Sequence, residues 1–171
     1  MLVLSDCSST YLREYSLAFL NVGTKEAPEY KRMTGFTELS TSKNAKEYSR
    51  KYVDEQSERT SITGYAPSMS YKFDYEPNNM VHKKVCEISD GELTGDAAVV
   101  TIVIVDLSTP SAEGGSSFNA KCRNFTVVPS GEGDDSEVYT YNGDFKADGD
   151  TITGTATTKD EWQTAEFVAN E

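Results

Sequence analysis

The sequence contains few residues of the kinds that carry chemistry. Its 171 residues include three cysteines (Cys7, Cys86 and Cys122), one histidine (His82) and one tryptophan (Trp162). Three cysteines without CxxC spacing do not make a disulfide framework, so we expect reduced thiols, with Cys86 and Cys122 buried and inert. A single histidine excludes a histidine-rich metal site, and a zinc site would need an unusual mixture of Cys, His and carboxylate ligands.

Positive charge is also scarce. The chain has 16 Lys and Arg against 28 Asp and Glu, which gives a net charge of −12. A protein that grips a phosphate backbone needs the opposite sign, so tight binding to nucleic acid or to an anionic membrane is disfavoured. An acidic surface near nucleic acid repels it and prevents sticking.

Long apolar runs are absent. The longest run is about half of the ~20 residues that a transmembrane helix needs. The apolar stretch 12–22 is interrupted by Arg13 and Glu14 and is followed by no small-residue cleavage site, so we expect no signal peptide. Without secretion, the sequon at Asn124–Thr126 is a chance match.

Catalytic and cofactor motifs are missing as well. There is no GxSxG, Walker A or GxGxxG pattern. His82 is in the helix expected at about 78–90 but not on its apolar stripe, so its side chain is expected to be exposed to solvent. An acidic cluster lacks the order of a calcium-binding loop and is expected to be a solvated hairpin tip; it comprises Glu132, Asp134, Asp135 and Glu137. We therefore expect no enzyme activity, no cofactor and no bound metal.

What the sequence does contain is alternation of apolar and polar residues. From Ser68 to Tyr75 the apolar side chains fall on every second residue, which predicts a half-buried strand. Its expected partner is the stretch 48–54. Further strands are expected across 118–128 and 138–147, with a tight turn at Asp148–Asp150. The last strand or strand pair is expected to contribute the core anchors Trp162 and Phe167.

The segment "GDAAVVTIVIVDL" (95–107) differs because it is apolar on both faces. Something must cover each face. One convincing helix precedes it, with Asn78 or Asn79 as N-cap and Gly91 as the C-terminal glycine. Its apolar stripe, Val81, Val85 and Ile88, can shield part of one face. A second sheet is expected against the other.

These patterns predict a mostly β protein: an antiparallel β-sandwich or barrel with one flanking α-helix at about 78–90. Residues 1–11 are expected to be a disordered extension. Residues 12–47 show no persistent period and are expected to form an N-terminal arm. Residues 48–171 are expected to form the β-sandwich domain.

Several blocks resemble one family. They are "YSLAFLNVGTKEAPEYKRMTGFTELSTSKNAKEYSRKYVDEQSERTSITGYAPSMSYKFDY", "GELTGDAAVVTIVIVDL" and "CRNFTVVPSGEGDDSEVYTYNGDFKADGDTITGTATTKDEWQTAEF". In order and wording they are similar to the major tail (tail tube) proteins of long-tailed bacteriophages, mainly of Gram-positive hosts. The resemblance runs from about Leu12 to Phe167, and no block in it is a catalytic fingerprint.

The resemblance implies a structural subunit. Hexameric rings would stack into a hollow tube, with strands of neighbouring subunits joined into a continuous inner barrel, and DNA would pass through the lumen at ejection without specific binding. The implied partners are further copies of the chain, the tape-measure protein and tail-terminator or tip proteins. The implied location is the virion tail, assembled in the host cytoplasm.

Two sets of residues are candidates for assembly roles. The first is predicted to make contacts between subunits or rings: Leu20, Tyr30, Met33, Phe36 and Leu39 in the arm, and Asp54, Glu55, Glu58 and Arg59 in the charged connection. The second is predicted to face the lumen: Ser68, Ser70, Lys72 and Asp74.

Two other functions fit less well. A monomeric immunoglobulin-like binding or adhesion module would share the β-sandwich, but it would not need some 35 residues of non-periodic N-terminus. A ligand-binding barrel or weak hydrolase would need a pocket lined with ionisable groups, which one histidine disfavours.

Overall fold

The computed structural model describes residues 10–111 and 116–171, and the described chain is mostly β. A short 3-10 helix, η1 (Arg13–Tyr15), precedes β1 (Ser16–Asn21), β2 (Tyr30–Arg32), β3 (Phe36–Ser42), β4 (Ala45–Arg50), β5 (Arg59–Tyr65) and β6 (Ser68–Asp74). The α-helix α1 (Met80–Asp90) and the 3-10 helix η2 (Gly95–Ala98) follow. The chain ends with β7 (Val99–Pro110), β8 (Ser117–Glu132), β9 (Thr140–Thr157) and β10 (Thr164–Ala169).

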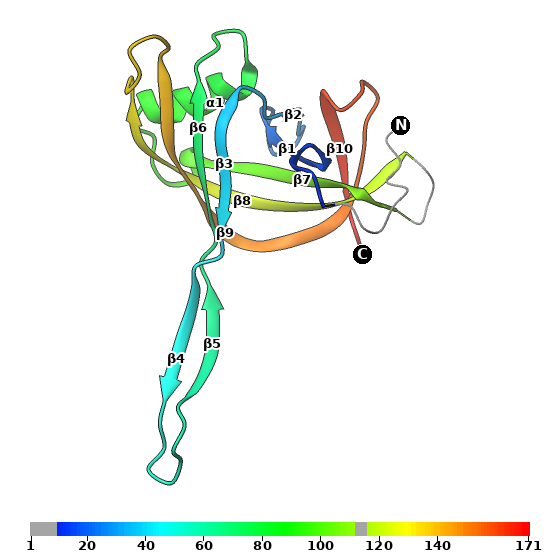
Figure 1. Ribbon diagram of the computed structural model, residues 1–171. Helices are drawn as coiled ribbons and strands as arrows, with labels where there is room; N and C mark the ends of the chain where they lie inside the picture. The colour runs from blue at the N-terminus through cyan, green and yellow to red at the C-terminus, as the bar shows by residue number, and fades with distance from the viewer. Residues whose placement is uncertain (1–9, 112–115) are drawn as a thin grey trace.

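Eight strands form one antiparallel sheet in the order β10-β2-β1-β7-β8-β9-β6-β3, and an additional β9–β10 pairing closes part of it into a barrel (Figure 1). The long strand β9 takes part in both the eight-stranded order and the barrel closure. One of its edges pairs with β8, while the other pairs first with β6 and then, from Gly154 onward, with β10. The predicted class, an antiparallel β-barrel or sandwich with one helix, is confirmed.

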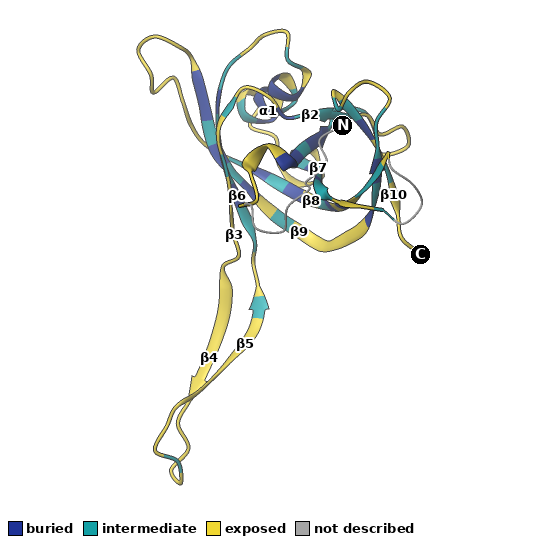
Figure 2. Ribbon diagram, turned by 45° about the vertical axis from the view of Figure 1, so that its right-hand side comes forward, coloured by how far each residue is buried: buried dark blue, intermediate teal, exposed yellow. Residues whose placement is uncertain are grey.

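The described residues form two hydrophobic cores, which lie on the two faces of β7. Figure 2 shows the buried segments of the chain in dark blue. Val103 and Val105 point into the barrel with Phe19. Ile102 points the other way, into a core shared with α1 and Leu20. Because successive side chains of a strand point to opposite faces, both faces of this strand are buried. The helix covers one face as expected, whereas the other faces the barrel interior rather than a second sheet.

The helix forms where it was predicted, and its N-cap is Asn79. The Asn79 side chain accepts hydrogen bonds from the backbone N–H of Val81 (3.0 Å) and His82 (3.3 Å), which satisfies two otherwise unpaired donors. The C-terminus differs from expectation. Gly91 has an ordinary right-handed conformation (φ −80°), and the left-handed residue is Glu92 (φ 48°).

The prediction that His82 is exposed was wrong, because its side chain is completely buried. The helix is covered on two sides, so a second row of its residues is buried beside the apolar stripe, including Cys86. The imidazole stacks on Phe73 with ring centroids 4.3 Å apart and presents an edge contact to Phe36 at 5.4 Å. A stripe defined by valine and isoleucine alone therefore underestimates how many residues of such a helix are buried.

The predicted N-terminal arm is instead built into the sheets: β1 and β2 belong to the barrel, and β3 is the last strand of the same large sheet. Strand β1 pairs with β2 and β7, and Phe19 and Leu20 are completely buried. The expected boundary between residues 47 and 48 falls inside β4. Short strands that pair with distant parts of the chain show no long period, which explains the error. Within the predicted extension 1–11, residues 1–9 lie outside the described residues, and the Tyr11 hydroxyl donates to the Asp106 carboxylate (2.9 Å).

Strand β6 forms as predicted but with different partners. It pairs with β3 and β9, while residues 45–50 pair with β5 in a separate two-stranded ribbon. The expected tight turn at Asp148–Asp150 was also wrong: this segment continues β9, and Gly149 bends it with a positive φ of 92°. Its carbonyl accepts a hydrogen bond from Arg123 of β8 (2.9 Å).

The two predicted C-terminal anchors do pack on the barrel core. Trp162 contacts Phe19 and Phe118, with ring centroids 6.1 and 5.6 Å away, and Phe167 packs against the same cluster. These aromatic rings line the part of the barrel that β10 closes.

Closure of the barrel depends on a glycine. A methyl group on Gly154 would lie 2.2 Å from the Val168 carbonyl oxygen and 2.7 Å from the Phe167 ring, so β10 could not keep its place. We expect Gly154→Ala to lower the free energy of unfolding by about 1–3 kcal/mol. The control Gly64→Ala meets no atom within 4 Å and should change it by less than about 0.5 kcal/mol. Urea titration measures both, and equal midpoints would contradict this account of closure.

Candidate assembly surface

Beyond the barrel, β3, β6, the first half of β9 and the end of β8 form a four-stranded sheet with one polar face. Alternation along β6 buries one set of side chains against α1 and turns the other set outward. The outward set is the four predicted lumen residues, Ser68, Ser70, Lys72 and Asp74, and each is half-buried. Opposite them on β9 lie Asn142, Asp144 and Lys146. The structure therefore brings the predicted residues together in one row on one polar surface.

The lysine in this row is matched by a carboxylate. Lys72 Nζ lies 3.0 Å from Asp134 Oδ2, and the Thr140 hydroxyl donates to the other oxygen of Asp134. These hydrogen bonds, from Thr140 first and then Lys72, hold the pKa of Asp134 below its usual value. Next in the row, Ser70 donates to Asp144 (2.9 Å). The face is thus polar without a cluster of unmatched positive charge.

The predicted acidic cluster lies on and beside the β8–β9 turn. The Asp135 carboxylate accepts from the backbone N–H of Glu137 (2.8 Å) and Val138 (3.3 Å), and these bonds lower its pKa. Its neighbour Asp134 is engaged by Lys72. In residues 10–111 and 116–171, no group of three or more His, Cys, Asp or Glu side chains is placed to hold a metal ion.

Both borders of the polar sheet are open edges. Strand β3 is the last strand of the sheet and pairs only with β6 among the described strands. The end of β8, from Val127 to Glu132, pairs with β9 alone because the β7 pairing stops at Thr126. Pro129 lies in that segment, as proline in sheets does at edges, since it has no ladder donor. With three antiparallel pairings between them, the two open edges run in opposite directions.

The register shows which backbone groups of β3 face outward. The Asp74 N–H donates to the Gly35 carbonyl (3.3 Å), so even-numbered positions of β6 turn their backbone groups toward β3. Their partners are even-numbered positions of β3, which leaves the N–H and C=O of Leu39 and Thr41 pointing away from the sheet. Consistent with this, the Leu39 carbonyl accepts from the Arg13 guanidinium (2.9 Å).

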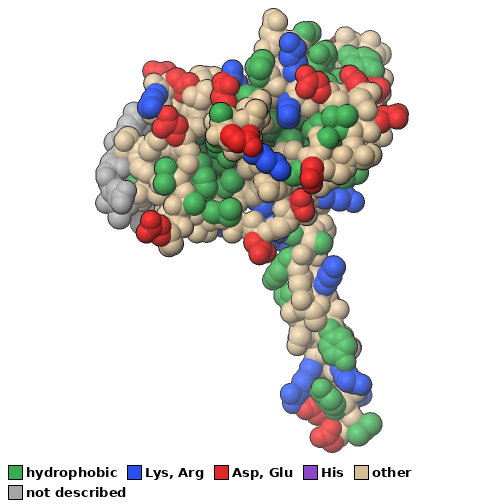
Figure 3. Space-filling model, turned by 180° about the vertical axis from the view of Figure 1, so that it is seen from behind, with side chains coloured by type: hydrophobic (Ala, Val, Ile, Leu, Met, Phe, Trp, Pro, Cys, Tyr) green, Lys and Arg blue, Asp and Glu red, His purple; other side chains and the backbone are tan. Residues whose placement is uncertain are grey.

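The β4–β5 ribbon projects from the body along the direction of β3 and β6, and nearly all of it is exposed (Figures 1 and 2). Four predicted contact residues lie at its tip: Asp54, Glu55, Glu58 and Arg59, of which Arg59 forms an ion pair with Glu55. The ribbon also exposes apolar side chains, and Figure 3 shows hydrophobic groups along it. The sequence analysis missed these residues, which are Tyr48, Tyr52, Val53, Ile62 and Tyr65. A lone two-stranded ribbon is marginally stable, and exposed apolar side chains are typical of contact sites, so the ribbon is a candidate contact surface.

The other predicted contact residues occupy different places. Leu20 and Met33 were predicted wrongly, because both are buried in the core beneath α1. Tyr30 packs against the barrel core, and Phe36 and Leu39 pack on the core under the helix, all three partly buried. Of this set, Leu39 has backbone groups that point away from the sheet at its open edge. At Leu20 and Met33, buried core residues were mistaken for surface contacts, while contact roles for Tyr30, Phe36 and Leu39 stay predictions.

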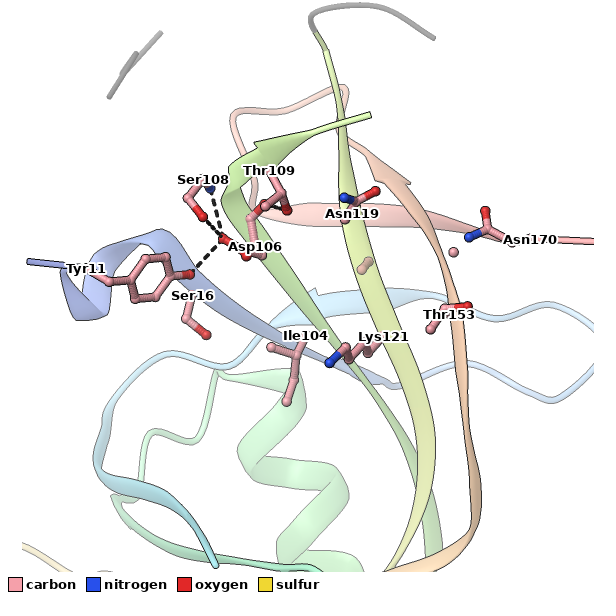
Figure 4. Close-up of a pocket in the computed structure, with 12 residues that line it drawn as sticks. Tyr11, Ser16, Ile104, Asp106, Ser108, Thr109, Asn119, Lys121, Thr153 and Asn170 are labelled. Atoms are coloured by element: carbon pink, nitrogen blue, oxygen red, sulfur yellow. Dashed lines mark hydrogen bonds between the residues drawn. The ribbon is translucent and has the colours of Figure 1, made fainter. Parts of the chain in front are cut away.

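Reactive side chains are not gathered anywhere in the described chain. Burial raises the pKa of the Cys86 thiol to about 11 and also raises that of Cys122, which keeps both protonated. A groove of about 740 Å³ lies on the outside of the barrel (Figure 4). Burial opposes ionisation of Asp106 there, but hydrogen bonds from Ser108 and Tyr11 keep its pKa low. No helix in the described part of the chain is long and apolar enough to cross a membrane.

Comparison with known proteins shows a likeness in fold. No family model matches the chain, and no curated protein sequence matches it. The structure is similar to a chain of the cryo-EM structure of the anti-feeding prophage (AFP) baseplate, 6-fold symmetrised, with a TM-score of 0.51 and 10% sequence identity. The match covers 85% of this chain and 96% of that chain.

The exposure of the ribbon predicts where a protease acts first. We expect trypsin to cut the monomer after Arg50, Lys51 or Arg59 well before it cuts after Lys121 or Arg123 in the barrel strand β8. Mass spectrometry of a time course measures the order. Replacing Arg50, Lys51 and Arg59 with glutamine should remove these three cuts, and a first cut in β8 would show that the ribbon is not the weakest segment.

Proposed function

We propose that this chain is a structural subunit of a bacteriophage tail, and specifically of a tail tube built from stacked hexameric rings. Its fold is like that of a chain in a prophage-derived baseplate with six-fold symmetry, and its sequence resembles tail tube proteins. In this proposal the lumen conducts DNA at ejection. The partners are other copies of the chain, the tape-measure protein and the terminator or tip proteins, and the protein is located in the virion tail.

One observation carries the proposal: a polar sheet bounded by two open edges that run in opposite directions. If β3 of one copy meets the end of β8 of the next, the added pair is antiparallel, like every other pair in the sheet. Such contacts are head-to-tail, and they generate a ring when the rotation closes. Closure would remove both exposed edges, which are otherwise an aggregation hazard.

The ribbon supports stacking of these rings. It extends β3 and β6 beyond the sheet in the direction of the strands (Figure 1). In a ring whose strands run along the axis, each ribbon would therefore leave the plane of its own ring and reach the next. The exposed Tyr52 and Val53 at the tip would be covered there.

The polar face suits a passage for DNA. In the proposed ring it would line the lumen, and the chain as a whole has a net charge of −12. The pairing of Lys72 with Asp134 neutralises one of the positive charges on this face, which weakens its hold on phosphate. A surface of this kind lets DNA pass without gripping it.

Lateral assembly can be tested at the edge of β3. Thr41→Pro removes an outward N–H without touching the ladder to β6, so we expect a folded monomer that forms no rings at any concentration. The matched control Thr41→Ala keeps the N–H and should assemble as the unaltered protein does. Negative-stain microscopy and size-exclusion chromatography of concentrated protein measure assembly, and urea titration confirms folding. Normal rings from Thr41→Pro would refute the edge contact.

Stacking can be tested separately at the ribbon tip. The double substitution Tyr52→Ser, Val53→Ser removes two exposed apolar side chains, so we expect single rings but few or no tubes in the same micrographs. Ser57→Ala, also at the tip, is the matched control and should still form tubes. If the unaltered protein stays a featureless monomer at every concentration, with nucleating tail proteins present or absent, the alternative of a monomeric immunoglobulin-like module is favoured instead.

A further inference from the structure

The one histidine of the chain occupies a corner where three segments meet: α1, the end of β6 and the turn before β3. Its Nδ1 accepts a hydrogen bond from the Glu76 backbone N–H (3.1 Å), and its Nε2 lies 2.7 Å from the Thr34 carbonyl oxygen. A carbonyl only accepts, so Nε2 carries the proton and Nδ1 does not. Both hydrogen bonds are therefore made by the neutral form of His82, in one tautomer.

The ring also fills the space between helix and strand. It stacks on Phe73 of β6 and contacts the edge of Phe36, the first residue of β3. A methyl group on Gly35 would lie 2.9 Å from its Cε1 atom, so the turn before β3 is closely applied to the imidazole. His82 thus ties α1 to the start of the edge strand, together with the N-cap Asn79, whose side-chain amide donates to the Thr34 hydroxyl (3.2 Å).

We propose that His82 is a pH-sensitive latch that holds the start of β3 on the body when neutral and releases it when protonated. A proton on Nδ1 would face the Glu76 N–H, so one hydrogen bond would become a repulsion between two donors. The charge would also be placed in a corner that is closed to bulk solvent.

The charged groups that face the ring do not reverse this preference. They are the carboxylates of Asp74 at the end of β6 and of Glu76 in the connection to α1, and the turn before β3 contributes the uncharged Thr34 and Gly35. Burial, the largest effect, lowers the pKa of His82 although the Thr34 carbonyl and these carboxylates favour the charged form.

The direction of the pH effect follows. When β3 is released, the His82 imidazole takes up a proton near the ordinary histidine pKa of about 6.5. When β3 is held in place, the imidazole takes up a proton only at lower pH. Opening is therefore promoted as the pH falls below about 6.5, by up to about tenfold per pH unit, until the ring protonates in place. Above that pH the latch is fully effective. If β3 makes the ring contact of the proposed function, acid would also weaken ring assembly.

Amide hydrogen exchange on the monomer tests the latch without any assembly. Between pH 7.5 and 5.5, after correction for intrinsic exchange, we expect protection of β3 to fall by several-fold to about tenfold, with β7 in the barrel unchanged. His82→Gln should remove this pH dependence, and Lys83→Gln, at the exposed next position, should retain it. Equal pH responses of β3 and β7 would overturn the latch while leaving the ring proposal intact, because the Thr41 variants test that separately.

A second measurement needs no variant. Since the chain has one histidine, ¹⁵N NMR of the imidazole reports its tautomer and pKa without ambiguity. We expect the proton on Nε2 at neutral pH and a pKa below the ordinary value. A proton on Nδ1, or titration at or above about 6.5, would overturn the proposal even if His82→Gln fails to fold.

Discussion

The rest of the structure depends on how β9 divides one of its edges between two partners. The end of this strand pairs with β10 and closes the barrel, and its beginning pairs with β6 and opens a second sheet. The bend at Gly149, with its positive φ, lies between the two pairings. A side chain there would be strained, so the glycine allows one strand to serve both a closed and an open structure. The barrel thereby loses its edges while the polar sheet keeps two.

This division separates the stable part of the molecule from the part available for assembly. The barrel buries Phe19, Val103 and Val105 completely, and its strands pair on both sides. By contrast, β3 has one partner strand and the ribbon has no partner outside itself among the described residues. Elements with few buried contacts are those that open locally, and they are also those that gain most from a neighbour. The proposed contacts therefore lie where folding leaves backbone groups and apolar side chains uncovered.

The sequence predicted what is decided locally. Alternation of apolar and polar residues predicted β6 and the row from Ser68 to Asp74. An N-cap followed by an apolar stripe predicted α1. It failed where distant segments decide: the partner of β6, the place of Leu20 in the core and the burial of His82. Those outcomes depend on which elements pack together, and no short-range pattern records that. The Asp-Gly-Asp segment shows the same limit, because its residues suit both a turn and a bend within a strand.

The two apolar faces of β7 connect these observations. One face completes the barrel and the other forms the core beneath α1, so the strand joins the closed unit to the open sheet through continuous packing. Because α1 covers the inner face of the open sheet, only the polar face and the edges of that sheet remain available to neighbours. A helix fixed in that place prevents a second sheet from packing on the inner face. The buried histidine at the corner of the same helix then controls the strand that would make one of those contacts.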